Sequence, residues 1–231
     1  MNTYCIRSVA GVNLFKNLQS LELINISLLA REISPLSDLK DLEALHIGGN
    51  KLSGEINFVQ GMKNLIYLDI SEKKLLGDLV ALSNLHKLRT LSIYNKNIKG
   101  NIKEISSLKE LRKLNLWCDK LRGNIASIEI FNELRILSLS CPWLMGDVKS
   151  LQHLNYLSTL YIVNNKKMKG GNSMNIFKDL AVPAPFLCVN RNDNDKYNAD
   201  NAMIGGVLDN DIYDQLLRYV SPDNIESVTK K

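Results

Sequence analysis

Apolar residues along most of this chain follow one phrase, LxxLxL, separated by polar stretches of constant length. One copy is Leu111, Leu114 and Leu116. The middle leucine recurs at a spacing of 23 residues over the central part of the chain, at Leu45, Leu68, Leu91, Leu114, Leu137 and Leu160. Residues two apart point to the same side of a strand, and the residue between them points to the other side. The phrase therefore predicts short parallel strands that stack and share one apolar core.

A second apolar period of three residues follows each strand phrase. In one repeat it runs through Ile102, Ile105, Leu108 and Leu111. This spacing favours 3₁₀ turns or an extended arch over an α-helix, whose period is 3.6. Each repeat is thus expected to pair one strand with a short 3₁₀ or extended return segment.

Five repeats also carry a glycine at one register position, followed two residues later by an aliphatic residue: Gly54, Gly77, Gly100, Gly123 and Gly146. With LxxLxL, this LxGx(I/L/V) phrase resembles leucine-rich-repeat proteins, in particular the plant-type class also seen in bacteria. The resemblance implies an α/β solenoid, a right-handed horseshoe with a parallel concave β-sheet and a mostly 3₁₀ or extended convex side. It also implies a second short strand on the descending side.

One family feature is incomplete in this sequence. The resemblance implies an asparagine, three residues after the second leucine, that bonds backbone groups of the next coil. Asn50 and Asn165 fit this position, whereas the repeats between them carry Lys73, Lys96, Asp119 and Pro142.

The repeat divides the chain into three regions. We expect an N-terminal cap or partial repeat at 1–17, leucine-rich repeats at 18–167, and a degenerate last repeat with a C-terminal cap at 168–231. Residues 187–192 restate the strand phrase and predict an eighth strand. Residues 209–220 have helical spacing and are followed by Pro222, which predicts a C-terminal capping helix. The polar run 190–201 lacks the glycine and glutamate of a calcium loop, so we interpret it as a plain loop.

Composition narrows the class of partner. The net charge is +5 and its lysines and arginines are spread along the chain, which argues against a nucleic-acid interface. No apolar run approaches the ~18 residues needed for a membrane span. No signal-peptide pattern follows Met1, so we expect a cytoplasmic protein if Met1 is the native start, and a surface or secreted one if the chain is trimmed. Cys118 and Cys141 share a register and are expected to be neighbouring free thiols.

The concave face is the predicted binding surface, because residues between and after each LxL pair point away from the core. The predicted partner-binding residues are Tyr67, Asp69, Tyr94, Asn115, Trp117, Tyr161, His46, Arg89, Arg112 and Arg135. Aromatic and arginine side chains are typical interface anchors. The alternative for the aromatic residues is packing among themselves across strands. For the arginine column the alternatives are a solvated face or a rim for an acidic partner.

The charged row Glu22, His46 and Asp69 contains residue types that bind metals or take part in catalysis. Such a row could hold a metal or act as a pH-sensitive patch, but a solvated, hydrogen-bonded row is the favoured interpretation. Ser92 beside Asp69 suggests a hydrolase only if an oxyanion donor accompanies it, and none is present. We therefore predict a monomeric, non-catalytic module without cofactor or metal that binds another protein or peptide. The runner-up is a carbohydrate- or peptide-binding module of a surface or secreted protein.

Overall fold

The computed structural model describes residues 9–26, 31–165, 167–169 and 186–189, and the account below is confined to them. Their main feature is one parallel sheet in which each repeat contributes one strand, in chain order. Its eight strands are β1 (Ser20–Ile24), β2 (Ala44–Gly48), β4 (Tyr67–Ser71), β6 (Thr90–Tyr94), β8 (Lys113–Trp117), β10 (Ile136–Ser140), β12 (Thr159–Val163) and β14 (Phe186–Val189). The strand predicted around Leu187 is confirmed, because β14 pairs with β12 and sets Leu187 opposite Leu160.

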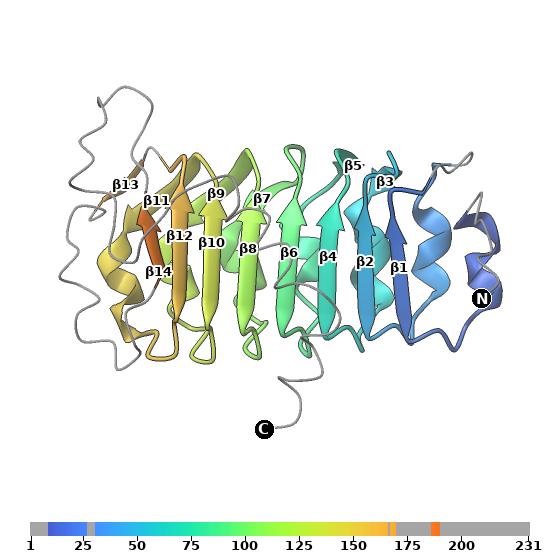
Figure 1. Ribbon diagram of the computed structural model, residues 1–231, viewed down its shortest axis with the longest axis horizontal. Coiled ribbons are helices and arrows are strands. Elements are labelled where there is room, and N and C mark those ends of the chain that lie inside the picture. Colours follow the sequence, from blue (N-terminus) through green and yellow to red (C-terminus); the bar gives the residue numbers. More distant parts are fainter. Residues whose placement is uncertain (1–8, 27–30, 166, 170–185, 190–231) are drawn as a thin grey trace.

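The strands pair in the register that the 23-residue spacing predicts. Leu91 lies opposite Leu114, and Leu114 lies opposite Leu137. These leucines, and the apolar residues two positions later, are fully buried in a single core that runs the length of the solenoid. In Figure 1 the strands stand in front, the return segments lie behind them, and the coils advance to the left, which makes the solenoid right-handed.

The return side is built from 3₁₀ helices, as the three-residue period predicts. They are η1 (Val9–Leu14), η2 (Ser34–Asp38), η3 (Ile56–Gly61), η4 (Leu79–Leu82), η5 (Ile102–Ile105), η6 (Ile125–Ile128) and η7 (Val148–His153). Asp78, Asn101 and Asn124 each precede one of these helices, and each side chain accepts a hydrogen bond from the backbone N–H two residues later. Side-chain capping of this kind helps to set where each short helix begins.

Short strands on the descending side precede the 3₁₀ helices, which confirms the second strand implied by the glycine phrase. They are β3 (Ser53–Glu55), β5 (Lys74–Leu76), β7 (Lys99–Asn101), β9 (Lys120–Asn124), β11 (Trp143–Asp147) and β13 (Lys167–Lys169). Gly123 in β9 has φ +118°, and a Cβ there would lie 2.9 Å from Cγ2 of Ile102 in the previous coil. The glycine is therefore required both by its backbone angle and by the close approach of the coils.

A ladder of buried polar side chains joins the coils, and here the sequence interpretation was wrong. The ladder does not lapse between Asn50 and Asn165. It continues one position earlier than expected, at Glu72, Asn95, Cys118 and Cys141. The Glu72 carboxylate accepts hydrogen bonds from the backbone N–H groups of Asn50 (2.8 Å) and Leu52 (3.1 Å). The strands end in the same register, but Glu72 and Asn95 stand one residue after the strand end, whereas Asn50 stands two residues after it.

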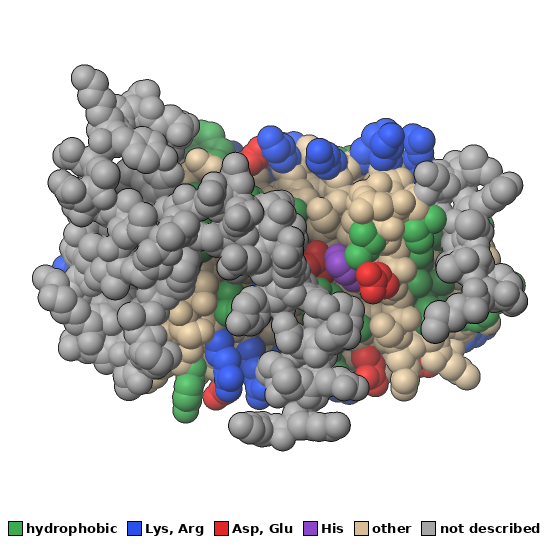
Figure 2. Space-filling view, viewed as in Figure 1, with side chains coloured by type: hydrophobic (Ala, Val, Ile, Leu, Met, Phe, Trp, Pro, Cys, Tyr) green, Lys and Arg blue, Asp and Glu red, His purple; other side chains and the backbone are tan. Residues whose placement is uncertain are grey.

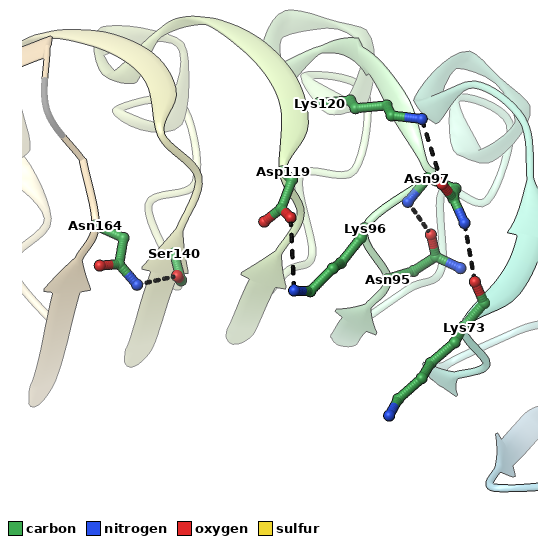
Figure 3. A network of polar contacts seen from close by, with 8 residues as sticks. All are labelled: Lys73, Asn95, Lys96, Asn97, Asp119, Lys120, Ser140 and Asn164. Carbon is green, nitrogen blue, oxygen red and sulfur yellow. Dashed lines mark hydrogen bonds and ion pairs between the residues drawn. The ribbon is translucent and has the colours of Figure 1, made fainter.

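Asn95 makes the most contacts of the central ladder residues. Its amide nitrogen donates to the carbonyl oxygens of Glu72 and Leu75, and its amide oxygen accepts from the backbone N–H groups of Asn97 and Ile98. Figure 3 shows Asn95 turned toward the backbone while Asn97 beside it contacts Lys73 and Lys120 nearer the surface. One side chain thus makes hydrogen bonds to four backbone groups at the turn.

The two described cysteines occupy the next ladder positions. Both are free and fully buried, and each thiol donates to a backbone carbonyl of the previous coil: Cys118 to Ile93 and Cys141 to Leu116. Burial raises the pKa of Cys118, and it raises the pKa of Cys141 to about 12. The sequence predicted neighbouring free thiols, and the structure adds that they act as small hydrogen-bonding core residues.

The N-terminal end of the solenoid contributes residues to the common core. Val9 and Val12 of η1 are buried in the common core, which fits a covering role for the first residues. The predicted capping helix at 209–220 and the polar loop at 190–201 lie outside the described residues. The division at 1–17, 18–167 and 168–231 stays a prediction.

Candidate functional site

The concave face is formed by alternate residues of the eight-stranded sheet, those that point away from the core. Its middle row is Glu22, His46, Asp69, Ser92, Asn115, Ser138 and Tyr161, each opposite the next in the strand register. This is the surface that Figure 2 views directly, with the histidine in purple between acidic side chains toward the N-terminal strands. All of the middle-row positions expected from the sequence are confirmed.

Three aromatic rings gather over the C-terminal half of this face. Tyr94 and Trp117, the last residues of β6 and β8, have ring centroids 5.6 Å apart and a tilt of 46°. Trp117 also leans across β10, so that its ring stacks on Tyr161 of β12 at 6.0 Å and 4°. We call Tyr94, Trp117 and Tyr161 the aromatic stack. The sequence register predicted the first pair but not the second, because a ring that crosses an intervening strand leaves no trace in the repeat.

The Trp117 ring can cross β10 because Ser138 and Ser140 of that strand, which lie beside it, are small and polar. Trp117 Nε1 donates to the hydroxyl of Ser138 in β10 at 3.1 Å. Ser92, Asn115 and Ser138 are at most 5% exposed, whereas the sequence pattern suggested solvent-facing positions. These short side chains therefore form a buried floor of the face.

Asn115 lies in the centre of that floor. Its amide nitrogen donates to the Ser92 hydroxyl at 3.3 Å, while its amide oxygen is buried and has no hydrogen-bond partner among the described residues. An unpaired buried acceptor costs free energy that a hydrogen bond would recover. Asn115 therefore differs from the asparagines of the ladder, whose amide oxygens are paired. No contact within the described part of the chain explains why its own amide oxygen is buried without a partner.

Tyr67 belongs to a second cluster, which contains the acidic row, rather than to the aromatic stack. Its hydroxyl donates to Asp69 Oδ2 at 3.4 Å, and its ring meets that of His46 edge-on at 6.3 Å. His46 Nε2 lies 4.0 Å from Asp69 Oδ1. Burial raises the pKa of Tyr67, and the neighbouring Asp69 adds to this effect. The predicted residues Tyr67, His46 and Asp69 are thus brought together as one unit with Glu22 at its edge.

The Lys113 side chain on β8 also interacts electrostatically with the cluster of Tyr67, His46 and Asp69. Burial raises the pKa of Asp69, and the nearby His46 and Lys113 oppose that rise. Burial lowers the pKa of Lys113, while Asp69 acts in the opposite direction. Asp69 on β4 and Lys113 on β8 lie on either side of β6, where Ser92 is opposite Asp69 and Thr90 is opposite Lys113. From the sequence, Lys113 was expected only as part of a basic edge beside Arg112, at the start of the strand that carries Trp117, and its interaction with Asp69 was not predicted.

The three predicted arginines form a column at the strand entrances. Arg112 N–H donates to the Arg89 carbonyl, and Arg135 N–H donates to the Arg112 carbonyl, both at 2.8 Å. Arg89 Nε lies 3.3 Å from Glu110 Oε2, one of the acids expected to separate these like charges. The column is therefore a rim of the concave face, several residues away from the aromatic stack.

Solved structures with the same arrangement of coils identify the fold. Internalin C2 from Listeria monocytogenes superposes with a TM-score of 0.59 at 20% identity, covering 76% of this chain and 73% of that one. The plant peptide hormone receptor RGFR1, in complex with RGF2, gives 0.60 at 26% identity, covering 78% of this chain and 29% of that one. The chain has the leucine-rich-repeat fold.

A third leucine-rich-repeat structure is that of the functional domain of InlJ from Listeria monocytogenes, which includes a cysteine ladder. It superposes with a TM-score of 0.58 at 18% identity, covering 78% of this chain and 36% of that one. No protein-family model and no curated protein matches the chain. The fold class expected from the sequence is confirmed, and the chain spans only part of the length of these three structures.

Two further observations concern metal binding and membrane spans. In the described ranges no group of three or more His, Cys, Asp or Glu side chains is placed to hold a metal ion. Among the same residues no helix is long and apolar enough to cross a membrane. The arrangement at the concave face thus offers aromatic surface, hydrogen-bonding groups and separated charges.

Proposed function

We propose that this protein is a non-catalytic binding module that holds another protein or peptide on its concave face. The observation that carries the proposal is the aromatic stack, Tyr94, Trp117 and Tyr161, on the side of the sheet that faces away from the core. Rigid aromatic surface beside polar and arginine side chains is the usual composition of an interface hot spot. The ten residues predicted from the sequence remain the proposed contact set.

The fold adds support of a general kind. A leucine-rich-repeat solenoid presents a long, rigid and regular surface, on which side-chain identity can vary without changing the backbone. One solved structure of this fold, RGFR1, is a plant peptide hormone receptor in complex with RGF2. A rigid surface favours affinity because little conformational entropy is lost by the protein on binding.

Affinity capture with three forms of the chain tests the proposal. Wild type, Trp117→Ala and Glu129→Ala are immobilised, and Glu129 serves as the control because it is exposed on the convex side. We expect a partner that wild type and Glu129→Ala retain and that Trp117→Ala loses. In titrations with that partner, Trp117→Ala should weaken binding by at least ~2 kcal/mol, about 30-fold.

The control for structural damage is a chemical unfolding curve. Trp117→Ala removes, among other interactions, the hydrogen bond to Ser138 and two ring contacts. At about 0.5–1.5 kcal/mol each, these should lower the unfolding free energy by about 2–4 kcal/mol, so the titrations are made where the variant is still folded. Equal affinity of wild type and Trp117→Ala for the captured partner would place the binding surface elsewhere. A glycan array probed with the same three forms tests the runner-up, a carbohydrate-binding module.

A further inference from the structure

The second sheet, on the descending side of the solenoid, presents outward side chains from four successive coils. Its strands are parallel and run in the order β13, β11, β9 and β7. Leu121 of β9 and Leu144 of β11 are fully buried, so the residues next to them in each strand point away from the core. The register puts the outward residues of all four strands on one face, which we call the descending face: Lys99 lies opposite Lys120, Arg122 opposite Trp143, and Met145 opposite Lys167.

The descending face is strongly basic. Its described residues include one carboxylate, Asp147, and five exposed cations: Lys99, Lys120, Arg122, Lys167 and Lys169. None of the five forms an ion pair with an acidic side chain of the described ranges. Cationic side chains also line the upper edge of the molecule in Figure 2, beside which Figure 1 labels the descending strands. Charges that are spread along the sequence are thus gathered on one face by the stacking of the coils.

These cations are close enough to act together. Neighbouring strands lie ~4.8 Å apart, which is less than the Debye length of about 8 Å at physiological ionic strength. Lys99 and Lys120 stand directly opposite each other, and like charges in that position destabilise a sheet. Figure 3 shows that Lys120 reaches Asn97, whose amide oxygen accepts a hydrogen bond at 3.2 Å but carries no negative charge. An anionic partner would relieve this repulsion.

Exposed apolar side chains stand among these charges. Trp143 and Met145 of β11 are each 47% exposed. Arg122 Cζ and Lys167 Nζ lie over the Trp143 ring, 5.9 Å and 4.6 Å from its centroid, and they come from the strands on either side of β11. A nucleic-acid base or a sugar that stacked on the ring would have to displace these cations. A soluble polyanion therefore has a use for the charges but not for the exposed apolar atoms.

An anionic lipid bilayer makes use of both features. Its headgroup phosphates attract lysine and arginine side chains, and a tryptophan suits the boundary between headgroups and acyl chains because one end of the ring is apolar and the other is polar. We propose that the descending face docks on the surface of a bilayer that contains anionic lipids. The cations lie against the headgroups, and Trp143 and Met145 enter the interfacial layer. This face is built from other strands than the concave face, so the inference does not depend on the proposed function.

Co-sedimentation of the full chain with lipid vesicles tests the inference. One set of vesicles is phosphatidylcholine alone, and the other contains roughly one-third phosphatidylserine, an anionic lipid. We expect the chain to sediment with the phosphatidylserine vesicles only, and to be released as added salt screens the charges. Equal sedimentation with both kinds of vesicle, or with neither, would overturn the inference.

Lys99→Glu tests the charges without a cost to the fold. Each lysine or arginine near an anionic surface contributes about fivefold in affinity, so a reversal should weaken vesicle binding at least tenfold. The melting temperature should stay unchanged or rise, because the new carboxylate lies opposite Lys120. Lys63→Glu is the matched control: it changes the net charge equally at an exposed lysine in the turn before β4, and it should stay within about threefold of wild type. Equal affinities of the two variants would contradict docking through this face.

Tryptophan fluorescence tests the contact itself. The chain has two tryptophans, so Trp117→Phe leaves Trp143 as the single reporter. Its emission should move to shorter wavelength and be quenched by brominated lipids when phosphatidylserine vesicles are added, whereas polyglutamate, a soluble polyanion, should cause neither change. Trp143→Ala should weaken vesicle binding at least fivefold and leave binding to polyglutamate unchanged. An unshifted Trp143 emission in vesicle-bound protein, or an equal effect of Trp143→Ala on both ligands, would overturn the inference and assign the descending face to a soluble polyanion.

Discussion

The ladder residue Asn95 offers the sharpest test of what holds the coils together. Asn95→Ala removes one buried side chain that contacts four backbone groups: the carbonyls of Glu72 and Leu75 and the N–H groups of Asn97 and Ile98. Nothing else in the hydrophobic core is changed. The expected result is a large loss of stability from a residue that makes no apolar contact of consequence.

The magnitude follows from the four hydrogen bonds. Each is worth about 1 kcal/mol net, which gives an upper figure of about 4 kcal/mol. The N–H of Asn97 is only partly buried, so water can replace the lost oxygen there, while Ile98 N–H and the Leu75 carbonyl are buried. We therefore expect Asn95→Ala to lower the unfolding free energy by about 2–4 kcal/mol.

Asn97→Ala is the matched control, since it is the same change two residues away. The Asn97 side chain bonds the Lys73 carbonyl and Lys120 Nζ near the surface, where water replaces both contacts. Its loss should cost about 0.5 kcal/mol or less. Urea unfolding followed by circular dichroism measures both, with equal slopes required for the comparison to hold. Equal midpoints for Asn95→Ala and Asn97→Ala would refute the ladder.

Three other predictions concern single positions. Gly123→Ala should destabilise by about 1–3 kcal/mol because φ is +118° and the previous coil is close, whereas Gly61→Ala, where a Cβ meets nothing nearer than 3.9 Å, should stay within about 0.5 kcal/mol in the same urea assay. Burial raises the pKa of Asp69, so the folded state keeps this proton to higher pH than the unfolded chain, and the contribution of Asp69 to stability falls as pH rises above 3.8. Asp69→Asn should therefore lose less stability than wild type as pH rises above 3.8 in pH-dependent melts, and an unchanged pH dependence would contradict this. Cys118 and Cys141 should resist a thiol reagent in native protein and react on denaturation, as read by peptide mapping, because burial raises both pKa values.

The sequence by itself determined the fold, because the same repeat spacing specifies both the individual strands and the pairing between strands that are distant in the chain. A strand phrase that returns every 23 residues fixes which residue faces the core in every coil, and the same register then sets Leu91, Leu114 and Leu137 side by side. The three-residue period and the glycine position likewise predicted the 3₁₀ helices and descending strands. The row Glu22, His46 and Asp69 followed from the same arithmetic.

Only the tertiary structure decided which partners the side chains contact, because the strand register places the backbone but not the side-chain rotamers. The ladder at Glu72, Asn95, Cys118 and Cys141 lies one residue from its expected position, because hydrogen-bonding reach depends on where each loop turns. Trp117 crosses β10 to meet Tyr161 because Ser138 is small and can accept its N–H. Tyr67 turns to Asp69 and His46. Repeat spacing places Cα atoms, whereas rotamers, burial and the choice among nearby partners are settled by packing between strands.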